Sequence, residues 1–579
     1  MLRCESEHQV QDREMNRRQI IKAVAGLGIG SAVFGRALAA RAADELQITP
    51  QMIQDAEWIA GLELTEEQRE QAARSLQYAN RNLEALRKVK LTNDIGPAVH
   101  FKTMAASAGE NGVPDRAPGM LDRGIGGRPE SDDQLAFLPV TKLASLIRSK
   151  KLSSVELTRI YLRRIEKYNP LLNCVVTVTE DLALKQARRA DEEIARGNYR
   201  GPLHGIPWGA KDLVAVPGYP TTWGAPQYRE QRLPQTATVA ARLEQAGAVL
   251  VAKLTMGALA MGDRWFGGMT RCPWNYRVGS SGSSAGSASA VVAGLCGFTL
   301  GTETLGSIVS PSRRCGATGL RPTFGRVSRA GCMALSWSMD KVGPITRSVE
   351  DCALVLSAIH GEDGLDPTAV TRDFAWPPET DLTRLTVGYT RGRTPLEDRS
   401  DIAKLKELGV QLKEVTLPTE IPVRGLTTVL DIEAAAAFDE LTRGGDVEGL
   451  NAWPAIFRKA SFVSGVDYVR AMRVRSLLQK QFEELMEGVD LLVNANDLVH
   501  TNLTGHPSLV MPVGFKKRMD VEMPFSTVFT GRLNGESDLM ALGLAYQNLH
   551  EAHLRQPPLE AEMKKMNDES KSADPVEGK

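Results

Sequence analysis

The segment from Gly279 to Gly331 constrains this 579-residue chain more than any other part of it. Its first eleven residues, GSSGSSAGSAS, have the composition of a flexible linker. A linker joins two domains, whereas this run continues directly into AVVAGLCGFTLGTE, which predicts a buried helix followed by a buried strand. We therefore expect the serines and glycines to enter a folded core.

A second interpretation starts from Gly282 to Gly286, which fit the pattern G-x-S-x-G. In a nucleophile elbow, the central serine, here Ser284, follows a strand, and an acid and then a histidine come later in the chain. The preceding residues, CPWNYRVGSSG, do not form a convincing strand pattern. The elbow stays an alternative, because three downstream histidines could complete a triad: His506, His550 and His553.

The chain around this segment alternates between helix and strand patterns. TATVAARLEQAG has helical spacing and is followed by the short apolar run AVLVAKL. Two helices are expected earlier, at Val140–Ser149 and Ser153–Tyr168. This alternation predicts an α/β fold, with one large domain over residues 135–555.

Three further segments flank that domain. Residues 44–103 have apolar side chains near helical spacing and a capping box at Thr65–Gln68, so they predict a helical N-terminal extension. Residues 104–134 are rich in glycine, proline and charge, which is typical of a linker. Residues 556–579 are charged, with almost no apolar anchor, and predict a disordered tail.

The N-terminus has the three parts of an export signal. Arg17 and Arg18 precede a short apolar run from Ile20 to Phe34, and small residues that fit an Ala-x-Ala cleavage site follow. The arginine pair and the glycine-rich run indicate the twin-arginine route, and the run is too short for a comfortable transmembrane helix. We expect residues 1–43 to be a signal peptide.

Acidic residues precede Met15, which favours Met15 over Met1 as the true start, because an export signal begins with a positive region. The mature protein is then expected in the periplasm or outside the cell, without stable membrane insertion. The alternative is a small amphipathic helix with a chance pair of arginines.

Composition excludes several other classes of protein. Lys+Arg and Asp+Glu both number 70, so no excess of charge favours nucleic acid or an anionic membrane as a partner. The eight histidines form no HExxH motif, and the seven cysteines form no CxxC pair. We therefore expect no metal and no cofactor, and nothing in the sequence indicates an oligomeric state.

The motifs around the Ser/Gly segment resemble the amidase signature family, the serine amidohydrolases with a Ser–cis-Ser–Lys triad. PLHGIPWGAKDL is similar to the family's lysine-bearing strand and loop, and CPWN, LRPTFGRVSRAG, DKVGPITRSVEDCALVL and NLTGHPSLVMPVGF follow in the family's order. The resemblance extends over residues 135–555. It implies a large mixed β-sheet flanked by helices, with the catalytic residues on loops along one side.

The resemblance assigns a role to each catalytic residue. Ser307, in GTETLGS, is implied to be the nucleophile, Ser283 the cis-serine that relays a proton, and Lys211 the base. A lysine can act as a base only when it is neutral, which requires burial or polar neighbours that lower its pKa. The backbone N–H groups of four residues would form the oxyanion hole: Thr304, Leu305, Gly306 and Ser307.

This sequence also departs from the family pattern. The family loop reads GTDxGGSIR, whereas GTETLGSIV stands here. Leu305 replaces a glycine, and either it is strained at positive φ or the loop has moved and its side chain lines the acyl pocket. We favour the second account. Val309 replaces an arginine, and we expect Arg313 or Arg314 to supply the missing charge.

The family resemblance leaves the substrate amide open. An aryl or alkyl amide, a peptide amide or a carbamate fits an exported enzyme acting on a small molecule. The glutamine-hydrolysing subunit of a tRNA-dependent amidotransferase is a second candidate, although DIEAAAAFDELTRGG, near Glu433, lacks that subunit's Arg-Tyr-Asp-Gly stretch. A third is a non-catalytic binding protein on an amidase scaffold, suggested by Leu305 and Val309.

Overall fold

The computed structural model describes residues 47–91, 97–99, 127–518 and 521–573. The expected signal peptide at 1–43 lies outside these residues, as does most of the expected linker at 104–134. The chain divides into two compact units, residues 1–80 and 81–579. None of the helices in the described ranges is both long enough and apolar enough to cross a membrane.

The described part of the first unit is helical. Helix α3 (Pro50–Ala60) begins after Thr49, whose side chain accepts the Met52 N–H, and helix α4 (Glu66–Lys88) follows and continues past residue 80 into the second unit. At the start of α4, the Thr65 N–H donates to Gln68 Oε1 at 2.9 Å and the Gln68 N–H donates to Thr65 Oγ1 at 3.3 Å. These two bonds form the capping box that the sequence predicts.

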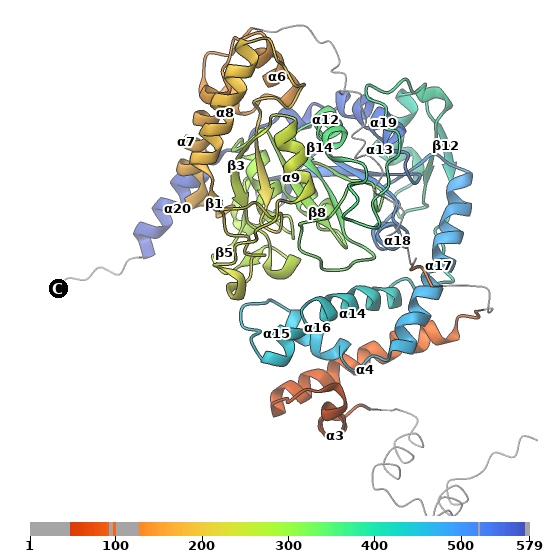
Figure 1. The fold of residues 1–579 in the computed structure, drawn as a ribbon. Helices are drawn as coiled ribbons and strands as arrows, with labels where there is room; N and C mark the ends of the chain where they lie inside the picture. The colour runs from red at the N-terminus through yellow and green to blue at the C-terminus, as the bar shows by residue number, and fades with distance from the viewer. Residues whose placement is uncertain (1–46, 92–96, 100–126, 519–520, 574–579) are drawn as a thin grey trace, which may run out of the picture. The chain divides into compact units, whose positions relative to one another are not determined.

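The second unit is built on an 11-stranded mixed sheet (Figure 1). This confirms the α/β fold with a large mixed sheet. The strands lie in the order β1 (Val175–Val178), β3 (Val249–Leu254), β2 (Pro207–Lys211), β8 (Phe298–Glu303), β10 (Lys341–Thr346), β9 (Thr318–Arg321), β14 (Ser508–Arg518), β15 (Val521–Gly531), β13 (Leu491–Val493), β11 (Thr386–Tyr389) and β12 (Gln411–Glu414).

Two small two-stranded sheets lie beside the large one. They pair β4 (Arg264–Trp265) with β5 (Gly268–Met269), and β6 (Arg271–Cys272) with β7 (Asn275–Gly279). Strand β7 was not expected, because NYRVG has too few apolar residues to show a strand pattern.

Helices cover the sheet on both sides. Alternate side chains of a strand point to opposite faces, and Leu250 of β3 packs in one apolar cluster while Val249 and Val251 pack in another. The helices of the second unit are α5 (Asp132–Ala136), α6 (Val140–Arg148), α7 (Ser154–Leu172), α8 (Glu180–Ala195), α9 (Thr238–Gln245), α10 (Ala285–Val292), α11 (Val309–Cys315), α12 (Val349–Ile359), α13 (Ser400–Glu407), α14 (Thr428–Ala437), α15 (Asp439–Gly444), α16 (Trp453–Ala460), α17 (Gly465–Glu487), α18 (Leu498–Thr504), α19 (Glu536–Asn548) and α20 (Leu559–Ala573).

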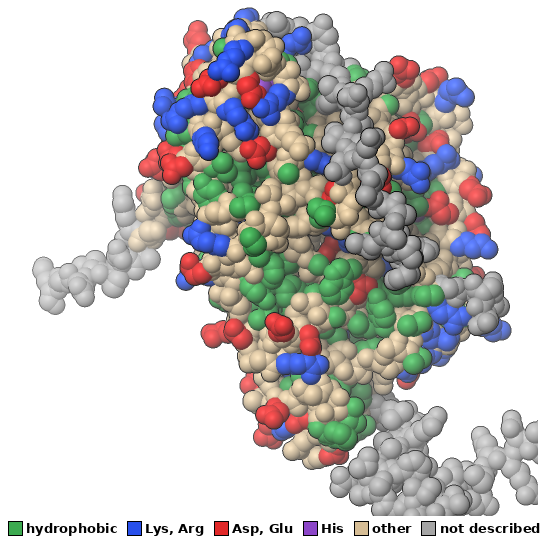
Figure 2. Space-filling view, viewed as in Figure 1, with side chains coloured by type: hydrophobic (Ala, Val, Ile, Leu, Met, Phe, Trp, Pro, Cys, Tyr) green, Lys and Arg blue, Asp and Glu red, His purple; other side chains and the backbone are tan. Residues whose placement is uncertain are grey.

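The predicted helix pair is confirmed by α6 and α7, and the predicted helix and strand near residue 245 by α9 and β3. Figure 2 shows acidic and basic side chains interspersed over the face that it displays, as the equal numbers of the two charges suggest.

The expectation of a disordered tail is wrong for residues 559–573, which form α20 beside α7 (Figure 1). Leu559 is buried there, and Met563 and Met566 pack against the same apolar cluster. These three residues recur at helical spacing, but the many charged residues around them make the segment resemble a disordered tail in composition.

Candidate active site

The site lies where two neighbouring strands end. Strands β2 and β8 are parallel, with Ala210 opposite Leu300, so their carboxyl ends meet at one edge of the sheet. Lys211 is the last residue of β2 and Glu303 the last of β8. The strand pairing thereby places the lysine beside the residues that lead to Ser307.

The segment that carries Ser283 enters the same place from β7. The Gly282–Ser283 peptide bond is cis, as the resemblance implies. A Cβ atom on Gly282 would lie 1.8 Å from the carbonyl oxygen of Gly262, so only glycine fits at this position. Helix α10 begins immediately afterwards at Ala285.

Lys211 is fully buried among hydroxyl groups. Its Nζ donates to Ser283 Oγ at 2.8 Å, to Ser284 Oγ at 3.1 Å and to Thr302 Oγ1 at 2.8 Å. Burial lowers the pKa of Lys211 to about 7, and the charges of Asp340 and Glu303 oppose this shift. Much of the amine is therefore neutral near pH 7, and it can accept a proton.

Ser307 lies at the start of the turn into α11 and is 9% exposed. Its carbonyl oxygen accepts the Ser284 N–H at 3.1 Å, which joins the two serine-bearing segments through the backbone. Within the described residues, no hydrogen bond links the Ser283 and Ser307 hydroxyls. Hydrogen bonds between catalytic groups often form fully only when substrate binds, so the missing bond does not argue against a relay from Ser307 to Ser283. The Ser307 hydroxyl is available to a reacting carbonyl.

The N–H groups of residues 304–307, here called the oxyanion loop, point to no acceptor among the described residues. Gly306 has a φ of 92°, which favours glycine, whereas Leu305 is not among the residues with positive φ. The strained form of Leu305 is thus not observed. Four successive N–H donors without partners, in the turn before α11, are suited to bind a negatively charged oxygen.

Glu303 fixes the far side of the oxyanion loop. Its Oε2 accepts the N–H groups of Ile308 and Val309 at 2.8 and 2.9 Å, and its Oε1 accepts Arg321 Nη1 at 2.7 Å. Arg321 is therefore the cation that pairs with Glu303. Neither Arg313 nor Arg314 reaches this carboxylate, against the expectation that one of them supplies the charge that Val309 lacks. Both of these arginines are exposed on α11, whereas Arg321 is buried at the end of β9.

The Glu303 carboxylate stays charged inside the protein. Burial would raise the pKa of Glu303, but the Arg321 charge and the Val309 amide outweigh burial and lower this pKa to about 2. The Asn502 side chain also donates to Oε1 at 2.8 Å. A buried carboxylate with four hydrogen bonds is a rigid anchor for the turn that carries Ser307.

The nucleophile elbow does not assemble around Ser284. This residue is fully buried at the start of α10, and its hydroxyl donates to the Thr302 carbonyl oxygen at 3.0 Å. The His506 ring contacts Thr504 and Glu483, and the His550 ring contacts the Tyr546 carbonyl oxygen. Neither His506 nor His550 hydrogen-bonds to Ser284.

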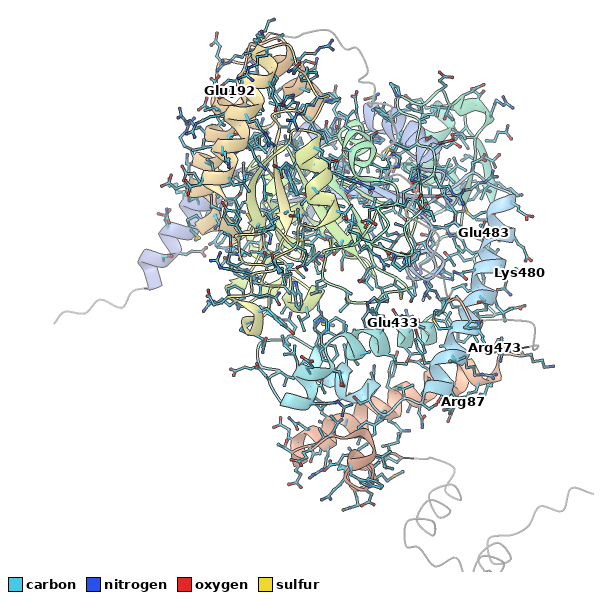
Figure 3. The ribbon with its side chains drawn as sticks, in the orientation of Figure 1. Arg87, Glu192, Glu433, Arg473, Lys480 and Glu483 are labelled. Carbon is cyan, nitrogen blue, oxygen red and sulfur yellow. The ribbon has the colours of Figure 1, made fainter. Side chains whose placement is uncertain are left out.

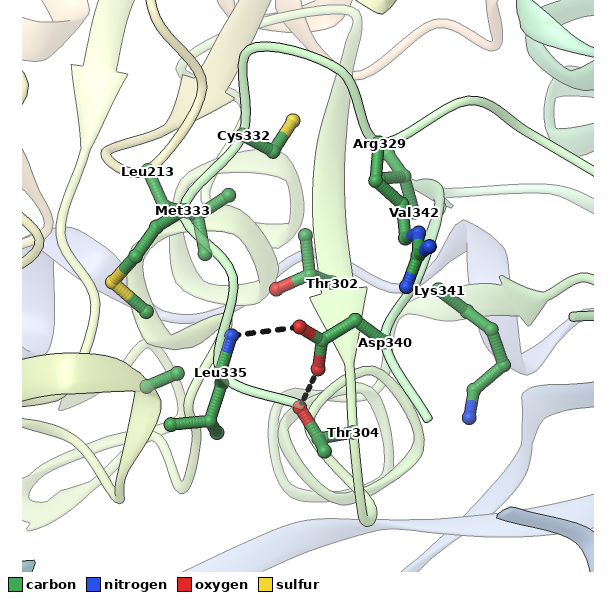
Figure 4. A pocket seen from close by; sticks show the side chains of 11 residues that line it. Leu213, Thr302, Thr304, Arg329, Cys332, Met333, Leu335, Asp340, Lys341 and Val342 are labelled. Atoms are coloured by element: carbon green, nitrogen blue, oxygen red, sulfur yellow. Dashed lines mark hydrogen bonds between the residues drawn. The ribbon is translucent and has the colours of Figure 1, made fainter. Parts of the chain in front are cut away.

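Sequence reasoning missed Thr302 and Asp340. Asp340 lies in DKVGPIT, which carries part of the resemblance, but only the fold brings it to Thr304. The two missed residues line a small cavity with Leu213 and Lys341 (Figure 4). This cavity measures about 10 Å³, which is too small for a substrate group, and the residues that line it do not include Lys211, Ser283 or Ser307.

The chain is similar to known amide-cleaving proteins over most of its length. The Amidase family model matches residues 156–496. One relative is a glutamyl-tRNA(Gln) amidotransferase subunit from Moorella thermoacetica, which is 33% identical over 487 residues that cover 74% of this chain and 99% of the relative. The corresponding subunit from Chloroflexus aurantiacus is 34% identical over 487 residues, with the same coverages.

Solved structures agree with the sequence relatives. The peptide amidase of Stenotrophomonas maltophilia has a TM-score of 0.62 at 28% identity, with 72% of this chain and 98% of that chain covered. An amidase family protein from Bacillus anthracis has a TM-score of 0.65 at 25% identity, with coverages of 74% and 93%.

The fold and these similarities define the protein as an amidase, a hydrolase of carboxylic amide C–N bonds. Within that class, the chain belongs to the amidase signature family.

The Glu303–Arg321 pair gives a stability prediction. Replacing Arg321 by Met leaves a buried carboxylate without its cation, and the loss of one partner of such a pair costs about 3–5 kcal/mol. We expect the free energy of urea unfolding of Arg321→Met to fall by about this amount at pH 7. Arg313→Met and Arg314→Met are the controls and should change it by less than about 0.5 kcal/mol.

The pH dependence of unfolding gives an independent check of the pairing between Glu303 and Arg321. In the wild type, the pKa of Glu303 is lower in the folded protein than in the unfolded chain. This difference stabilises the fold fully at pH values above the pKa of the unfolded chain, and the stabilisation is lost as pH falls toward about 2. Without Arg321, this pKa should rise above the unfolded value, so the stability deficit should be larger at pH 7 than at pH 4. A deficit that is equal at both pH values, or larger in Arg313→Met, would contradict the pairing.

Proposed function

We propose that the protein is an exported serine amidohydrolase in which Ser307 is the nucleophile, Ser283 the proton relay and Lys211 the base. The observation that carries this proposal is the buried Lys211 amine, 2.8 Å from Ser283 Oγ and with a pKa of about 7. A lysine in this state can be neutral at the pH where the enzyme works.

The proposed reaction forms and breaks one covalent bond to the enzyme. Ser307 Oγ attacks the amide carbon, its proton passes to Ser283 Oγ, and the proton of Ser283 passes to Lys211 Nζ. The N–H groups of the oxyanion loop stabilise the oxyanion of the tetrahedral intermediate. The proton then returns through Ser283 to the leaving nitrogen, the C–N bond breaks, and an acyl-enzyme remains on Ser307.

Water completes the cycle. A water molecule attacks the acyl carbon, and its proton follows the same relay to Lys211. The second tetrahedral intermediate collapses, Ser307 regains a proton through Ser283, and the carboxylic acid leaves. Every proton that enters the relay leaves it, so the cycle consumes one amide and one water and returns the enzyme to its starting state.

Amidase-family enzymes act on small amides, and for this chain we propose a small external amide rather than glutamine on a tRNA-dependent complex. The expected export signal supports this choice, because an exported enzyme meets no charged tRNA. The sequence identity to two amidotransferase subunits favours the other candidate, the glutamine-hydrolysing subunit of a tRNA-dependent amidotransferase. A panel of aryl, alkyl and peptide amides that includes glutamine separates the two, since rapid glutamine hydrolysis would favour the amidotransferase role.

The triad predicts three inactive variants. Ser307→Ala, Ser283→Ala and Lys211→Ala should each lower kcat on the best amide of the panel by on the order of 10⁴-fold or more. The triple variant should lose little more than Ser307→Ala, because the three residues act as a unit. Steady-state kinetics and labelling by a fluorophosphonate serine probe measure both effects.

Ser284→Ala is the matched control for the triad. It removes a neighbouring hydroxyl from Lys211 and should retain far more activity than Ser283→Ala. An inactive Ser284→Ala beside an active Ser307→Ala would restore the nucleophile elbow. A wild-type protein that neither reacts with the probe nor cleaves any amide would support a non-catalytic binding protein.

Leu305 predicts a change in substrate range. Its negative φ supports the account in which the loop has moved and the side chain narrows the acyl pocket. Leu305→Gly should then accept bulkier acyl groups in the amide panel, with little change in melting temperature. Leu305→Ala is the control, because it shortens the side chain without freeing the backbone, and it should give most of the same gain.

The opposite pattern would show that strain matters. If Leu305→Gly raises the melting temperature while substrate preference stays constant, backbone strain at this position of about 1–3 kcal/mol is the correct account.

If the protein is exported by the twin-arginine route, export should depend on Arg17 and Arg18, which precede the described residues. Replacing Arg17 and Arg18 by Lys should retain the precursor in the cytoplasm, because the twin-arginine route depends on the guanidinium pair. Cell fractionation measures this, and N-terminal sequencing of wild-type mature protein should find a start near Ala40 or Ala43. Normal processing of the double variant would exclude this route.

A further inference from the structure

A loop opposite the oxyanion loop holds it in place. Residues 332–340, here called the Asp340 loop, turn back so that Asp340 Oδ2 accepts the N–H groups of Leu335 and Ser336 at 2.8 and 2.9 Å. Its other oxygen, Oδ1, accepts Thr304 Oγ1 at 2.5 Å (Figure 4). One carboxylate therefore joins the Asp340 loop to the first residue of the oxyanion loop.

A second carboxylate holds the outer side of the Asp340 loop. Glu433, on α14 (Figure 3), is 5% exposed. Its Oε2 accepts Ser336 Oγ at 2.6 Å and the Ser338 N–H at 3.0 Å, and its Oε1 accepts Ser338 Oγ at 2.7 Å. Tyr468 Oη on α17 donates to the same Oε1 at 2.9 Å.

An arginine of α17 completes the clamp. Arg475 Nη1 donates to Ser338 Oγ at 2.7 Å, and Nη2 donates to the Ser338 carbonyl oxygen at 2.8 Å. Glu433 and Arg475 thus hold Ser338 from both sides with opposite charges. A buried carboxylate that receives four hydrogen bonds from two segments restricts both of them more strongly than a neutral contact would.

We propose that Glu433 is a positioning residue for the amide-hydrolysing site: it fixes the Asp340 loop, and through this loop it sets the placement of the Asp340 carboxylate and of Thr304. This inference rests on the proposed function, because it needs Ser307 and Lys211 to be catalytic. Glu433 touches neither the serines of the triad nor the lysine, so its effect passes through the Asp340 loop. It also connects catalysis to α14 and α17.

The test measures the second-order rate of Ser307 labelling by a fluorophosphonate probe, which requires no knowledge of the natural substrate. Glu433→Gln keeps the size of the side chain but replaces one accepting oxygen by an NH2 donor, so it loses the charge and two of the four accepted hydrogen bonds. We expect labelling to slow by about 10- to 100-fold, because a misplacement of about 1 Å at a reacting centre costs on the order of 100-fold. Asp431→Asn is the matched control on the same helix, since Asp431 contacts Lys459 instead of the Asp340 loop, and its rate should stay within about twofold of the wild type.

A pH profile separates positioning from general destabilisation. The carboxylates whose charge acts on Lys211 are Asp340 and Glu303, and Asp340 itself faces Arg329. The Cys332 thiol also acts on Lys211, but burial raises the pKa of Cys332 to about 12, so it is neutral over the pH range of the test. Asp340→Asn can keep the Thr304 and backbone hydrogen bonds but removes one negative charge. Labelling should rise with pH as Lys211 loses its proton, and the midpoint should move to lower pH in Asp340→Asn, because the protonated lysine loses a stabilising neighbour.

Two further variants keep the test decisive. If Glu433→Gln does not fold, Ser336→Ala removes a single hydrogen bond to Glu433 and should slow labelling in the same direction by a smaller factor. The double variant Asp340→Asn/Glu433→Gln should be no slower than the slower single variant, because both act through one loop.

The outcomes distinguish this inference from the function on which it rests. Labelled wild-type protein with equal rates for Glu433→Gln and Asp431→Asn, or an unmoved midpoint in Asp340→Asn, would overturn the positioning role alone. Unlabelled wild-type protein, with Ser307→Ala as the blank, would overturn the proposed function itself.

Discussion

The parallel pairing of β2 and β8 brings a lysine and a carboxylate to the same edge of the sheet and buries both. The protein treats these two charges differently. Glu303 has Arg321, Asn502 and two backbone amides as partners, so it remains ionised. Lys211 has hydroxyl groups as its partners and no carboxylate in contact among the described residues, so burial favours its neutral form. The Glu303 carboxylate therefore stays charged and anchors the structure, whereas burial lowers the pKa of Lys211 so that its neutral amine can accept a proton.

Much of this arrangement could be predicted from the sequence. The order of helices and strands around Lys211 and the buried Ser/Gly segment follow from patterns that are local in the chain, and the family resemblance implies the cis bond at Ser283. Arg321 could not be predicted in this way, because it reaches Glu303 only through the pairing of β9 with β10 and of β10 with β8. Arg313 and Arg314 are nearer in sequence to Val309, but α11 directs them to solvent.

Asp340 and Glu433 were missed for the same physical reason. Each is one acidic residue among 70, and a single carboxylate in a sequence is most often on the surface. Their importance depends on contacts between segments that are 36 and 97 residues apart. Helix α20 was missed for a different reason, since its three apolar residues pack well but are outnumbered by charged neighbours.

Helix α20 has a consequence for how the enzyme is made. Glu562 of α20 accepts the N–H of Tyr276 in β7 at 3.1 Å, and β7 leads within four residues to Ser283. The ribosome adds α20 long after β7, and folding of a nascent chain generally proceeds from its N-terminal parts. The segment that carries Ser283 therefore lacks one of its supports until α20 has been synthesised, some 350 residues after Lys211.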